Sequence, residues 1–374
     1  MKILFAGGGT AGHINPALAV AGYVRSQKPE AQILFVGSKG GMEERLVPQA
    51  GFEFRSVTVS GFIRKMNWNG IKHNAVAIKR AFSATRESKR ILEQFRPDGC
   101  VGTGGYVSGP VLRKAKKMGI PVLIHEQNAF PGVTTKMLAR LADKVMLAIP
   151  DAEKRLGSSL HEKIVVTGNP VRSELIYANR EEARKKLKLD ERPVILSYGG
   201  SLGAEQVNRA VAELMIQTAK TDAVQHIHAY GQYGRWFPAL LEERGVVLRD
   251  HPNLDIREYI DNMPDCIAAA DLLICRAGAI TLSELQVQGK PAVLIPSPNV
   301  AENHQYYNAL ALSSRGAAFL LEEKDLTGES LCKLVFGLLK DPEKLRECGR
   351  NAQKMAIVDA NERIYREIIK VLQK

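Results

Sequence analysis

Residues 272–305 combine apolar strands, a turn of small residues and a helix in the order of a phosphate-binding unit. The turn at 276–279 has no acidic side chain, so its backbone N–H groups and the start of the following helix could meet an anion, and a diphosphate fits best. Glu284 lies about one helical turn further on, where its carboxylate could accept hydrogen bonds from a sugar diol. The next helix opens with three side chains suited to hydroxyl groups, Asn303, His304 and Gln305. Together these residues predict a pocket for a nucleoside-diphosphate sugar; an ordinary strand-to-helix turn with a solvated glutamate is the alternative.

Two glycine turns near the N-terminus also have the composition of phosphate-binding loops. Gly7, Gly9 and Gly12 match the GxGxxG pattern after an apolar strand at 2–6, and GTGGYVSGP at 102–110 forms a second turn. The second strand, 33–36, ends without the acidic residue that holds an adenine ribose, which argues against an NAD-dependent dehydrogenase. We therefore predict loops that bind a phosphate other than that of NAD. A later strand, 121–124, ends in HEQN at 125–128, at the sheet edge where ligands bind.

The glycine turns occur in two halves of the chain, and in each half the same order of strand, turn and helix positions them. A strand at 194–198, a glycine turn at 199–204 and a helix at 205–215 repeat the arrangement of residues 2–26. The sequence thus predicts an α/β protein with two Rossmann-like domains that face a cleft. GNPVR at 168–172 marks the junction between an N-terminal domain, 1–166, and a C-terminal domain, 167–357, and an amphipathic helix ends the chain.

The net charge of +12 is concentrated in the first half of the chain. Residues 1–150 hold 22 Lys/Arg and 9 Asp/Glu, whereas residues 151–374 hold 30 and 31. This asymmetry implies an anionic partner, and sparse aromatic residues without a nucleic-acid motif argue against nucleic acid. Residues 60–90 form a basic stretch with a helical apolar stripe, which predicts contact with an anionic membrane surface unless the stripe packs into the core. The predicted membrane contacts are Phe62, Trp68, Ile71, Lys72, Ile78, Lys79 and Phe82.

The cysteines indicate the cellular compartment, and the absence of an acidic metal-binding motif bears on the cofactors. The five cysteines form no CxxC pair and leave one unmatched, so we expect reduced thiols in a cytoplasmic protein without a zinc site. No apolar run is long enough to cross a bilayer, and the first residues resemble a strand rather than a signal peptide. Because the sequence has no Asp-x-Asp pair, we expect no metal clamp on a diphosphate and no cofactor.

Six motifs, in this order, resemble the MurG family of glycosyltransferases: GGGTAGHINPALAVA at 7–21, GTGGYVSGP at 102–110, HEQN at 125–128, TGNPVR at 167–172, GGSLGA at 199–204 and RAGAITLSE at 276–284. The resemblance covers essentially the whole chain and implies a glycosyltransferase B fold whose last helix, 358–374, crosses back to the N-terminal domain. It also implies transfer of N-acetylglucosamine from UDP-N-acetylglucosamine to an undecaprenyl-linked muramyl-pentapeptide, with inversion at the anomeric carbon. The implied setting is peptidoglycan synthesis by a peripheral protein at the cytoplasmic face of the cell membrane.

The resemblance further implies a role for individual residues. Uracil would rest against Ile260 and near Met263, and Glu284 would hold the ribose hydroxyls. The implied donor-binding residues are Thr10, Ala11, Gly12, Asn128, Arg172, Ser201, Ile260, Met263, Gly278, Ala279, Ile280, Thr281, Glu284, His304 and Gln305. The acceptor's diphosphate would bind at Gly8, Gly9, Thr10, Gly104, Gly105 and Tyr106. The chain departs from many members at His304 and Leu202, where glutamine is common.

Such a transfer needs a base for the acceptor hydroxyl and positive potential for the leaving UDP. Helix starts after the turns at 199–204 and 276–279, together with Arg172, could supply that potential. The candidate bases are His13 and Glu126, and His13 is preferred because imidazole ordinarily titrates near neutral pH. The alternative for His13 is a residue that orders the loop or binds phosphate. A nucleotide-sugar epimerase of the same architecture and a non-catalytic, membrane-docking subunit that binds the sugar nucleotide remain as other functions.

Overall fold

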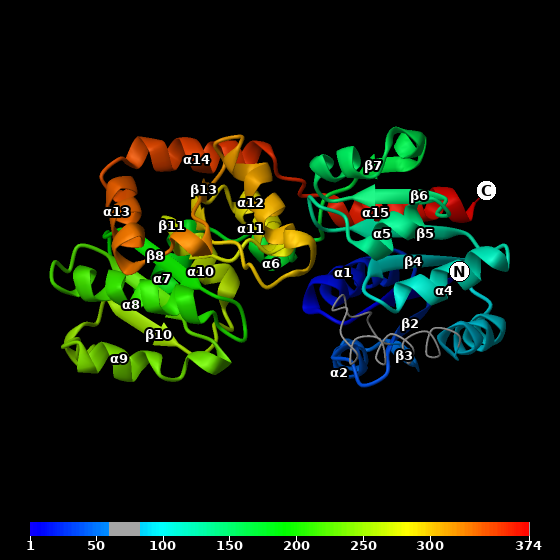
Figure 1. The fold of residues 1–374 in the computed structure, drawn as a ribbon, viewed down its shortest axis with the longest axis horizontal. Helices are drawn as coiled ribbons and strands as arrows, with labels where there is room; N and C mark the ends of the chain where they lie inside the picture. Colours follow the sequence, from blue (N-terminus) through cyan, green and yellow to red (C-terminus); the bar gives the residue numbers. More distant parts are fainter. Residues whose placement is uncertain (60–82, 374) are drawn as a thin grey trace, which may run out of the picture. The chain divides into compact units, whose positions relative to one another are not determined.

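The computed structural model describes residues 1–59 and 83–373. The chain divides into two compact units (Figure 1). The N-terminal unit comprises Met1–Pro170 together with Asp359–Lys374, and the C-terminal unit comprises Val171–Val358. The junctions predicted from the sequence, 166/167 and 357/358, lie four residues and one residue before these boundaries.

The N-terminal unit is a parallel sheet of seven strands with helices between them. The strand order is β3-β2-β1-β4-β5-β6-β7, so the order reverses between β1 and β4. A helical segment at 83–95 precedes β4. The other elements are β1 (Lys2–Gly7), α1 (Ala11–Gln27), β2 (Gln32–Ser38), α2 (Glu43–Gln49), β3 (Glu53–Val57), β4 (Gly99–Gly104), α4 (Ser108–Lys117), β5 (Val122–Glu126), α5 (Val133–Ala139), β6 (Lys144–Leu147), η1 (Pro150–Arg155), η2 (Ser158–Lys163), β7 (Ile164–Val166) and α15 (Ala360–Leu372). The sequence analysis did not predict β3, whose residues are only partly buried apart from Val57.

The central strand β1 explains why this unit is a doubly covered parallel sheet. Its apolar side chains are buried on both faces, as expected for a strand between two helical layers. Ile3 and Phe5 pack into the core on one face, and Leu4 and Ala6 pack into a separate core on the other. The last helix, α15, completes the first of these cores, since Ile364 belongs to the same cluster (Figure 1). The chain therefore returns to its first unit after building the second.

The C-terminal unit repeats this plan with six strands. The order is β10-β9-β8-β11-β12-β13, which reverses between β8 and β11. Its helices are α6 (Ser173–Ile176), α7 (Arg180–Lys186), α8 (Glu205–Ala219), α9 (Phe237–Glu243), α10 (Met263–Ala269), α11 (Ala279–Gln288), α12 (His304–Ser313), α13 (Gly328–Leu339) and α14 (Pro342–Lys354). Its strands and short 3-10 turns are β8 (Val194–Tyr198), β9 (Gln225–Ala229), β10 (Leu254–Arg257), β11 (Leu272–Cys275), β12 (Ala292–Leu294), β13 (Phe319–Leu320), η3 (Gln232–Gly234), η4 (Leu248–Asp250), η5 (Ala301–Asn303) and η6 (Glu323–Asp325).

Two histidines are buried in the middle of the C-terminal sheet. Ser197 Oγ lies 2.7 Å from His226 Nε2 and 2.8 Å from His228 Nδ1. His228 Nδ1 also donates to the Ser197 carbonyl oxygen at 3.1 Å, so its Nε2 is the unprotonated nitrogen of the neutral ring. Burial lowers the pKa of both histidines, that of His228 to about 3. Both rings are therefore neutral in the folded protein at neutral pH.

We expect this cluster to make the C-terminal unit sensitive to acid. An unfolded histidine gains a proton below about pH 6.5, whereas the folded His228 does not until about pH 3, so stability is complete above pH 6.5 and falls with decreasing pH. The loss is about 1.4 kcal/mol per pH unit for each such histidine. Urea unfolding at about pH 7.5 and about pH 5.5 measures it. His228→Gln should weaken the pH dependence of the free energy of unfolding. His251→Gln changes a histidine of the same unit that is not buried, so it should preserve this dependence. An equal pH dependence in the wild type and both variants would refute the role of His228.

The predicted membrane contacts, Phe62, Trp68, Ile71, Lys72, Ile78, Lys79 and Phe82, all lie outside the described residues. In the part of the chain that is described, no helix has the length and apolar character needed to cross a bilayer. The five cysteines are all buried and unpaired.

Candidate active site

Each unit has its glycine turns at the carboxyl end of the sheet, where the strand order reverses. In the N-terminal unit these turns follow β1 and β4, and in the C-terminal unit they follow β8 and β11. Loops that leave such neighbouring strands diverge to opposite faces of the sheet, which opens the crevice where α/β proteins bind ligands. The residues predicted for the site fall at these two positions, one in each unit.

The first glycine turn is held by a buried carboxylate that the sequence analysis missed. Glu43 is 1% exposed, and its two oxygens accept hydrogen bonds from the Gly9 N–H at 3.1 Å and the Ser38 N–H at 2.8 Å. A Cβ atom at Gly8 would lie 2.0 Å from the same carboxylate. The Gly9 amide is thus already used, and a second anion beside it would meet the charge of Glu43. The acceptor's diphosphate at Gly8 and Gly9 stays a prediction, and the Gly9 N–H that could serve it already donates to Glu43.

The start of α1 is the better place for a phosphate in this turn. Thr10 is in the extended conformation and makes no side-chain cap hydrogen bond, and the first turn of α1 contains no acidic residue. Ala11 and Gly12 are exposed there. The N–H groups and the positive end of the helix dipole at Thr10, Ala11 and Gly12 suit an anion. The family resemblance gave all three residues to the donor and Thr10 also to the acceptor, and these assignments stay predictions.

The second glycine turn packs directly against the first. Gly105 has φ +81°, and a Cβ atom there would lie 2.3 Å from the Gly8 carbonyl oxygen. A Cβ atom at Gly104, where φ is +111°, would lie 2.7 Å from His13 Nδ1. Thr103 Oγ1 donates to the His13 carbonyl oxygen at 2.8 Å. Gly104 and Gly105 therefore allow close approach of the two turns and place His13, while Tyr106 beside them is 60% exposed.

The HEQN motif joins this cluster from the end of β5. His13 is half-buried, and its Nδ1 lies 3.1 Å from Gln127 Oε1. Gln127 is 2% exposed, and the sequence analysis gave it no role of its own. The motif thereby brings a buried amide against the candidate base.

The Glu126 carboxylate is fully engaged within its own loop. It is 3% exposed and accepts hydrogen bonds from Asn128 N at 3.0 Å, Asn128 Nδ2 at 3.1 Å, Gly132 N at 3.2 Å and Thr135 Oγ1 at 2.5 Å. Donors from its own loop and from α5 surround both carboxylate oxygens, so the buried carboxylate is not presented to a substrate hydroxyl. This geometry disfavours Glu126 as the base and makes it the residue that orders the loop carrying Asn128.

In the C-terminal unit, the turn after β11 leads into a helix start without an acidic residue. Gly278 caps α11 in the extended conformation, and no side chain caps the helix or places a negative charge in its first turn. Asn308 Nδ2 donates to the Ala277 carbonyl oxygen at 3.1 Å from inside α12. The Arg276 guanidinium donates to the carbonyl oxygens of Ile295 and Pro296, both at 3.2 Å, and forms an ion pair with Glu323. Arg276 thus ties the turn to its neighbours, and the helix start with Gly278, Ala279, Ile280 and Thr281 keeps the geometry of an anion site.

Glu284 lies on the second turn of α11 and is paired with Arg172. Its Oε1 is 3.6 Å from Arg172 Nη2, and the two side chains are 12% and 54% exposed. Burial raises the pKa of Glu284, and the charge of Arg172 opposes that shift. A carboxylate with one cationic neighbour and an incompletely buried edge can accept hydrogen bonds from a diol.

The other predicted donor residues of the C-terminal unit lie at the same end of its sheet. Ser201 is exposed in the turn after β8, Ile260 is buried after β10, and Met263 opens α10. His304 Nδ1 donates to the Ala301 carbonyl oxygen at 2.8 Å. Gln305 Oε1 accepts a hydrogen bond from the Ser297 N–H at 2.9 Å. These two predicted donor-binding side chains therefore also order the loop at 297–303.

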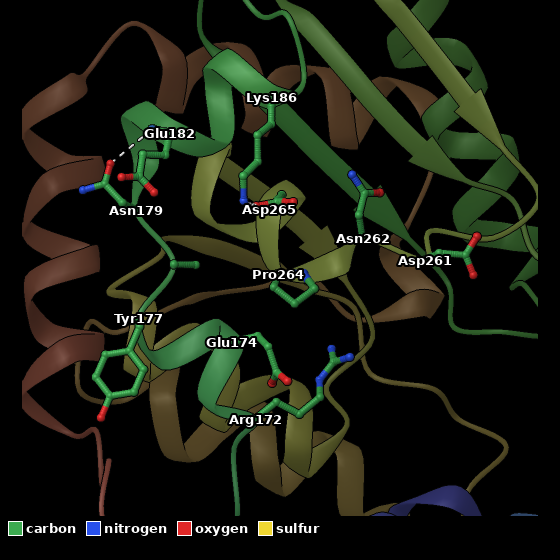
Figure 2. Close-up of a pocket in the computed structure, with 11 residues that line it drawn as sticks. Arg172, Glu174, Tyr177, Asn179, Glu182, Lys186, Asp261, Asn262, Pro264 and Asp265 are labelled. Carbon is green, nitrogen blue, oxygen red and sulfur yellow. Dashed lines mark hydrogen bonds and ion pairs between the residues drawn. The ribbon is translucent and has the colours of Figure 1, made fainter. Parts of the chain in front are cut away.

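An open pocket of about 520 Å³ lies beside this site, between α6, α7 and the start of α10 (Figure 2). Among the predicted donor residues, only Arg172 lines it. Figure 2 also shows Asp261, Asn262 and Pro264 on its wall, in the segment that carries Ile260 and Met263. Arg172 thus connects the pocket to Glu284. Within the described residues, no three His, Cys, Asp or Glu side chains gather where they could hold a metal ion.

These features define a class of protein: a two-domain α/β enzyme of the glycosyltransferase B type, with glycine turns at the carboxyl end of each sheet. Residues 3–147 match the glycosyltransferase family 28 N-terminal domain, and residues 194–364 match its C-terminal domain. The chain belongs to the MurG family within glycosyltransferase family 28.

Relatives and solved structures agree along the whole chain. A UDP-N-acetylglucosamine–N-acetylmuramyl-(pentapeptide) pyrophosphoryl-undecaprenol N-acetylglucosamine transferase of Acetivibrio thermocellus is 45% identical, over 100% of this chain and 99% of the relative. The transferase of the same name from a Thermoanaerobacter species is 46% identical over 98% and 99% of the two chains. The crystal structure of Acinetobacter baumannii MurG has a TM-score of 0.78 and 31% identity, with 99% of both chains covered.

The fold by itself does not separate transferases from epimerases. The crystal structure of the UDP-GlcNAc 2-epimerase from Neisseria meningitidis has a TM-score of 0.67 but only 15% identity, over 99% of this chain and 100% of the other. That likeness shows a shared fold and no more. The epimerase considered from the sequence is disfavoured by the family matches rather than by the architecture.

Proposed function

We propose that this protein transfers N-acetylglucosamine from UDP-N-acetylglucosamine to the muramyl sugar of undecaprenyl-pyrophosphoryl-N-acetylmuramyl-pentapeptide, the step from lipid I to lipid II in peptidoglycan synthesis. The observation that carries this function is the full-length similarity to transferases of that name, at 45% and 46% identity. The site agrees with it, because a sugar nucleotide and a diphosphate-linked acceptor each need an anion-binding turn.

In the C-terminal unit, the donor's diphosphate would lie at the start of α11. The open helix start and Arg172 supply positive potential there, which stabilises the negative charge that develops on the leaving UDP. Glu284 would accept hydrogen bonds from the ribose hydroxyls, and Ile260 and Met263 would contact the uracil. These roles need no metal ion, and we propose that the transfer proceeds without one.

In the N-terminal unit, His13 would act as the base. As the acceptor hydroxyl oxygen forms its bond to the anomeric carbon, the bond from that carbon to the UDP oxygen breaks and UDP leaves with the electron pair. The hydroxyl proton passes to His13, and attack from the face opposite to UDP inverts the anomeric carbon. We place the acceptor's diphosphate at the start of α1, next to Thr10, Ala11 and Gly12, whereas the family resemblance gave Ala11 and Gly12 to the donor.

Release of UDP from UDP-N-acetylglucosamine, with and without a soluble lipid I analogue and in the presence of EDTA, tests this function. We expect release that depends on the analogue and continues at an unchanged rate in EDTA. Donor binding without turnover would favour the non-catalytic subunit. Formation of the 2-epimer of the donor sugar would favour the epimerase. Analogue-dependent release that is lost in EDTA would refute the metal-free mechanism but not the assignment as a transferase.

We also propose that the N-terminal unit docks on an anionic membrane at its cytoplasmic face. A lipid-linked acceptor requires contact with a bilayer, and exposed apolar side chains lie among cations on α4 and α5 in this unit. Val133 and Met137 are 60% and 40% exposed, one helical turn apart, and Arg113 Nη1 lies 3.8 Å from Met137 Sδ. Apolar side chains flanked by basic ones suit an anionic interface.

Sedimentation with vesicles tests the docking proposal. We expect the protein to bind vesicles that contain phosphatidylglycerol more strongly than vesicles of phosphatidylcholine alone, and the difference to decrease with salt. The double variant Val133→Ser/Met137→Ser should weaken binding, whereas Tyr233→Ser, which changes a 71% exposed residue of the C-terminal unit, should not. Equal binding to both vesicle types, or preference for DNA over vesicles, would contradict the proposal.

A further inference from the structure

Three side chains of the N-terminal unit form a hydrogen-bonded series that ends at His13. His125 Nε2 lies 2.9 Å from the Gly168 carbonyl oxygen. Gln127 Nε2 lies 3.0 Å from His125 Nδ1, and Gln127 Oε1 lies 3.1 Å from His13 Nδ1. His125 and Gln127 are 3% and 2% exposed, so water does not compete for these contacts.

The backbone fixes the direction of each hydrogen bond in this series. A carbonyl oxygen can only accept, so His125 must carry its hydrogen on Nε2, and its Nδ1 is then the acceptor of the neutral ring. Burial lowers the pKa of His125, which favours that neutral form. The Gln127 amide nitrogen also donates to the His125 carbonyl oxygen at 3.0 Å. Two independent acceptors therefore orient the amide, and its oxygen is left facing His13.

The same logic extends to His13. An amide oxygen can only accept, so the hydrogen of the neutral His13 ring is on Nδ1 and the lone pair is on Nε2. Gly104 leaves room for this side of the ring, because a Cβ atom there would lie 2.7 Å from Nδ1. We infer that Gln127, oriented by His125, is a positioning residue that holds His13 as the Nδ1–H tautomer, so that Nε2 receives the proton of the acceptor hydroxyl.

This inference rests on the proposed role of His13 as base and specifies the atom. When Nε2 takes the proton, the imidazolium keeps its Nδ1–H on Gln127 Oε1, and the amide dipole stabilises the new charge. The amide cannot take up the Nδ1 proton itself, so the proton stays on His13 until solvent or product removes it. The HEQN motif would thus serve catalysis through Gln127, whereas Glu126 orders the adjacent loop.

The tautomer can be measured directly in the wild-type full-length protein. Two-bond proton–nitrogen NMR correlations of protein labelled with ¹⁵N-histidine distinguish a protonated ring nitrogen from an unprotonated one, and His13→Gln identifies the His13 signals. We expect a protonated Nδ1 and an unprotonated Nε2 for His13, and the reverse for His125. An Nε2–H tautomer at His13 would overturn the inference, whatever the activity.

A variant then connects the tautomer to the reaction. Gln127→Met keeps the volume but removes the acceptor, so we expect the His13 tautomers to mix and kcat to fall about 10- to 100-fold, with the donor KM changed less than about threefold. Gln225→Met is the matched control, since Gln225 is also buried but lies in the other unit, and it should keep the wild-type kcat and His13 spectrum. Wild-type tautomer and kcat in Gln127→Met would refute the positioning role.

These experiments distinguish a wrong assignment of His13 as the base from a wrong positioning role of Gln127. If His13→Ala retains full kcat, His13 is not the base, although the NMR experiment can still find the Nδ1–H tautomer. If His13→Ala abolishes turnover while wild-type His13 is the Nε2–H tautomer, the base stands and the positioning role fails.

Discussion

Replacing His13 by alanine is expected to lower kcat about 10²- to 10⁴-fold, the usual contribution of a general base. The KM for UDP-N-acetylglucosamine should change less than about threefold, because the predicted contacts to uracil, ribose and sugar come mainly from the C-terminal unit. His13 contacts Gln127 through its side chain and lies against Gly104, both in the N-terminal unit, whereas Glu284 and Arg172 belong to the C-terminal unit. Steady-state release of UDP at a saturating concentration of the lipid I analogue measures both constants.

A matched control separates loss of the base from loss of a histidine in general. His161 belongs to the same unit, is paired with Glu153 and has a side chain that is 78% exposed. His161→Gln should therefore show wild-type kcat and KM. A His13→Ala enzyme with unchanged kcat would exclude His13 as the base, and a large increase in donor KM with unchanged kcat would instead make it a phosphate ligand.

The strands and turns of the site could be predicted from the sequence because their signals are local. β1 is apolar at every position that it buries, and the turn that follows it is rich in glycine. The same holds for β8 and β11 with their turns, so the repeated arrangement was visible without a structure. Strand β3 was missed because its residues are mostly half-buried or exposed and show no continuous apolar run.

The hydrogen-bond partners inside the site could not be predicted, since they come from distant parts of the chain. Glu43 opens α2, yet its carboxylate binds the Gly9 amide, and no local pattern connects the two residues. Gln127 stands in a motif that was recognised as polar, but its contact with His13 depends on the packing of β5 beside the first turn. Glu126 was considered as a base because side-chain type alone does not show that four donors surround its carboxylate.

The same limitation applies to the turn that contains Gly8 and Gly9. A glycine-rich turn before a helix is a common phosphate site, and the sequence of this turn contains no acidic residue. The three-dimensional structure brings Glu43 to it, whereas the first turn of α1 contains no acidic residue. Tertiary packing thus decides which amides of this loop remain for a ligand, and the local sequence does not show it.

Replacing Glu284 by alanine should raise the donor KM about 10²-fold or more. Two hydrogen bonds from ribose hydroxyls to a charged acceptor contribute about 1.5–3 kcal/mol each, and both are lost in this variant. Glu284→Gln keeps one acceptor oxygen without the charge, so an intermediate increase of about tenfold is expected. Isothermal titration with UDP, together with the donor KM, measures the effect. Normal donor binding in Glu284→Ala would contradict the ribose assignment.

The pairing of Glu284 with Arg172 predicts how donor binding depends on pH. Burial raises the pKa of Glu284 and Arg172 opposes the shift, so the carboxylate is fully charged above its folded pKa and loses an acceptor as the pH falls through it. Arg172→Met removes the opposing charge at 3.6 Å, which raises this pKa further. The midpoint of the acid loss of UDP affinity should therefore move to higher pH in Arg172→Met, in addition to any uniform weakening from the lost positive charge. An identical midpoint in the wild type and in Arg172→Met would mean that the protonation of Glu284 does not control UDP binding. Glu284 would then not hold the ribose as a carboxylate.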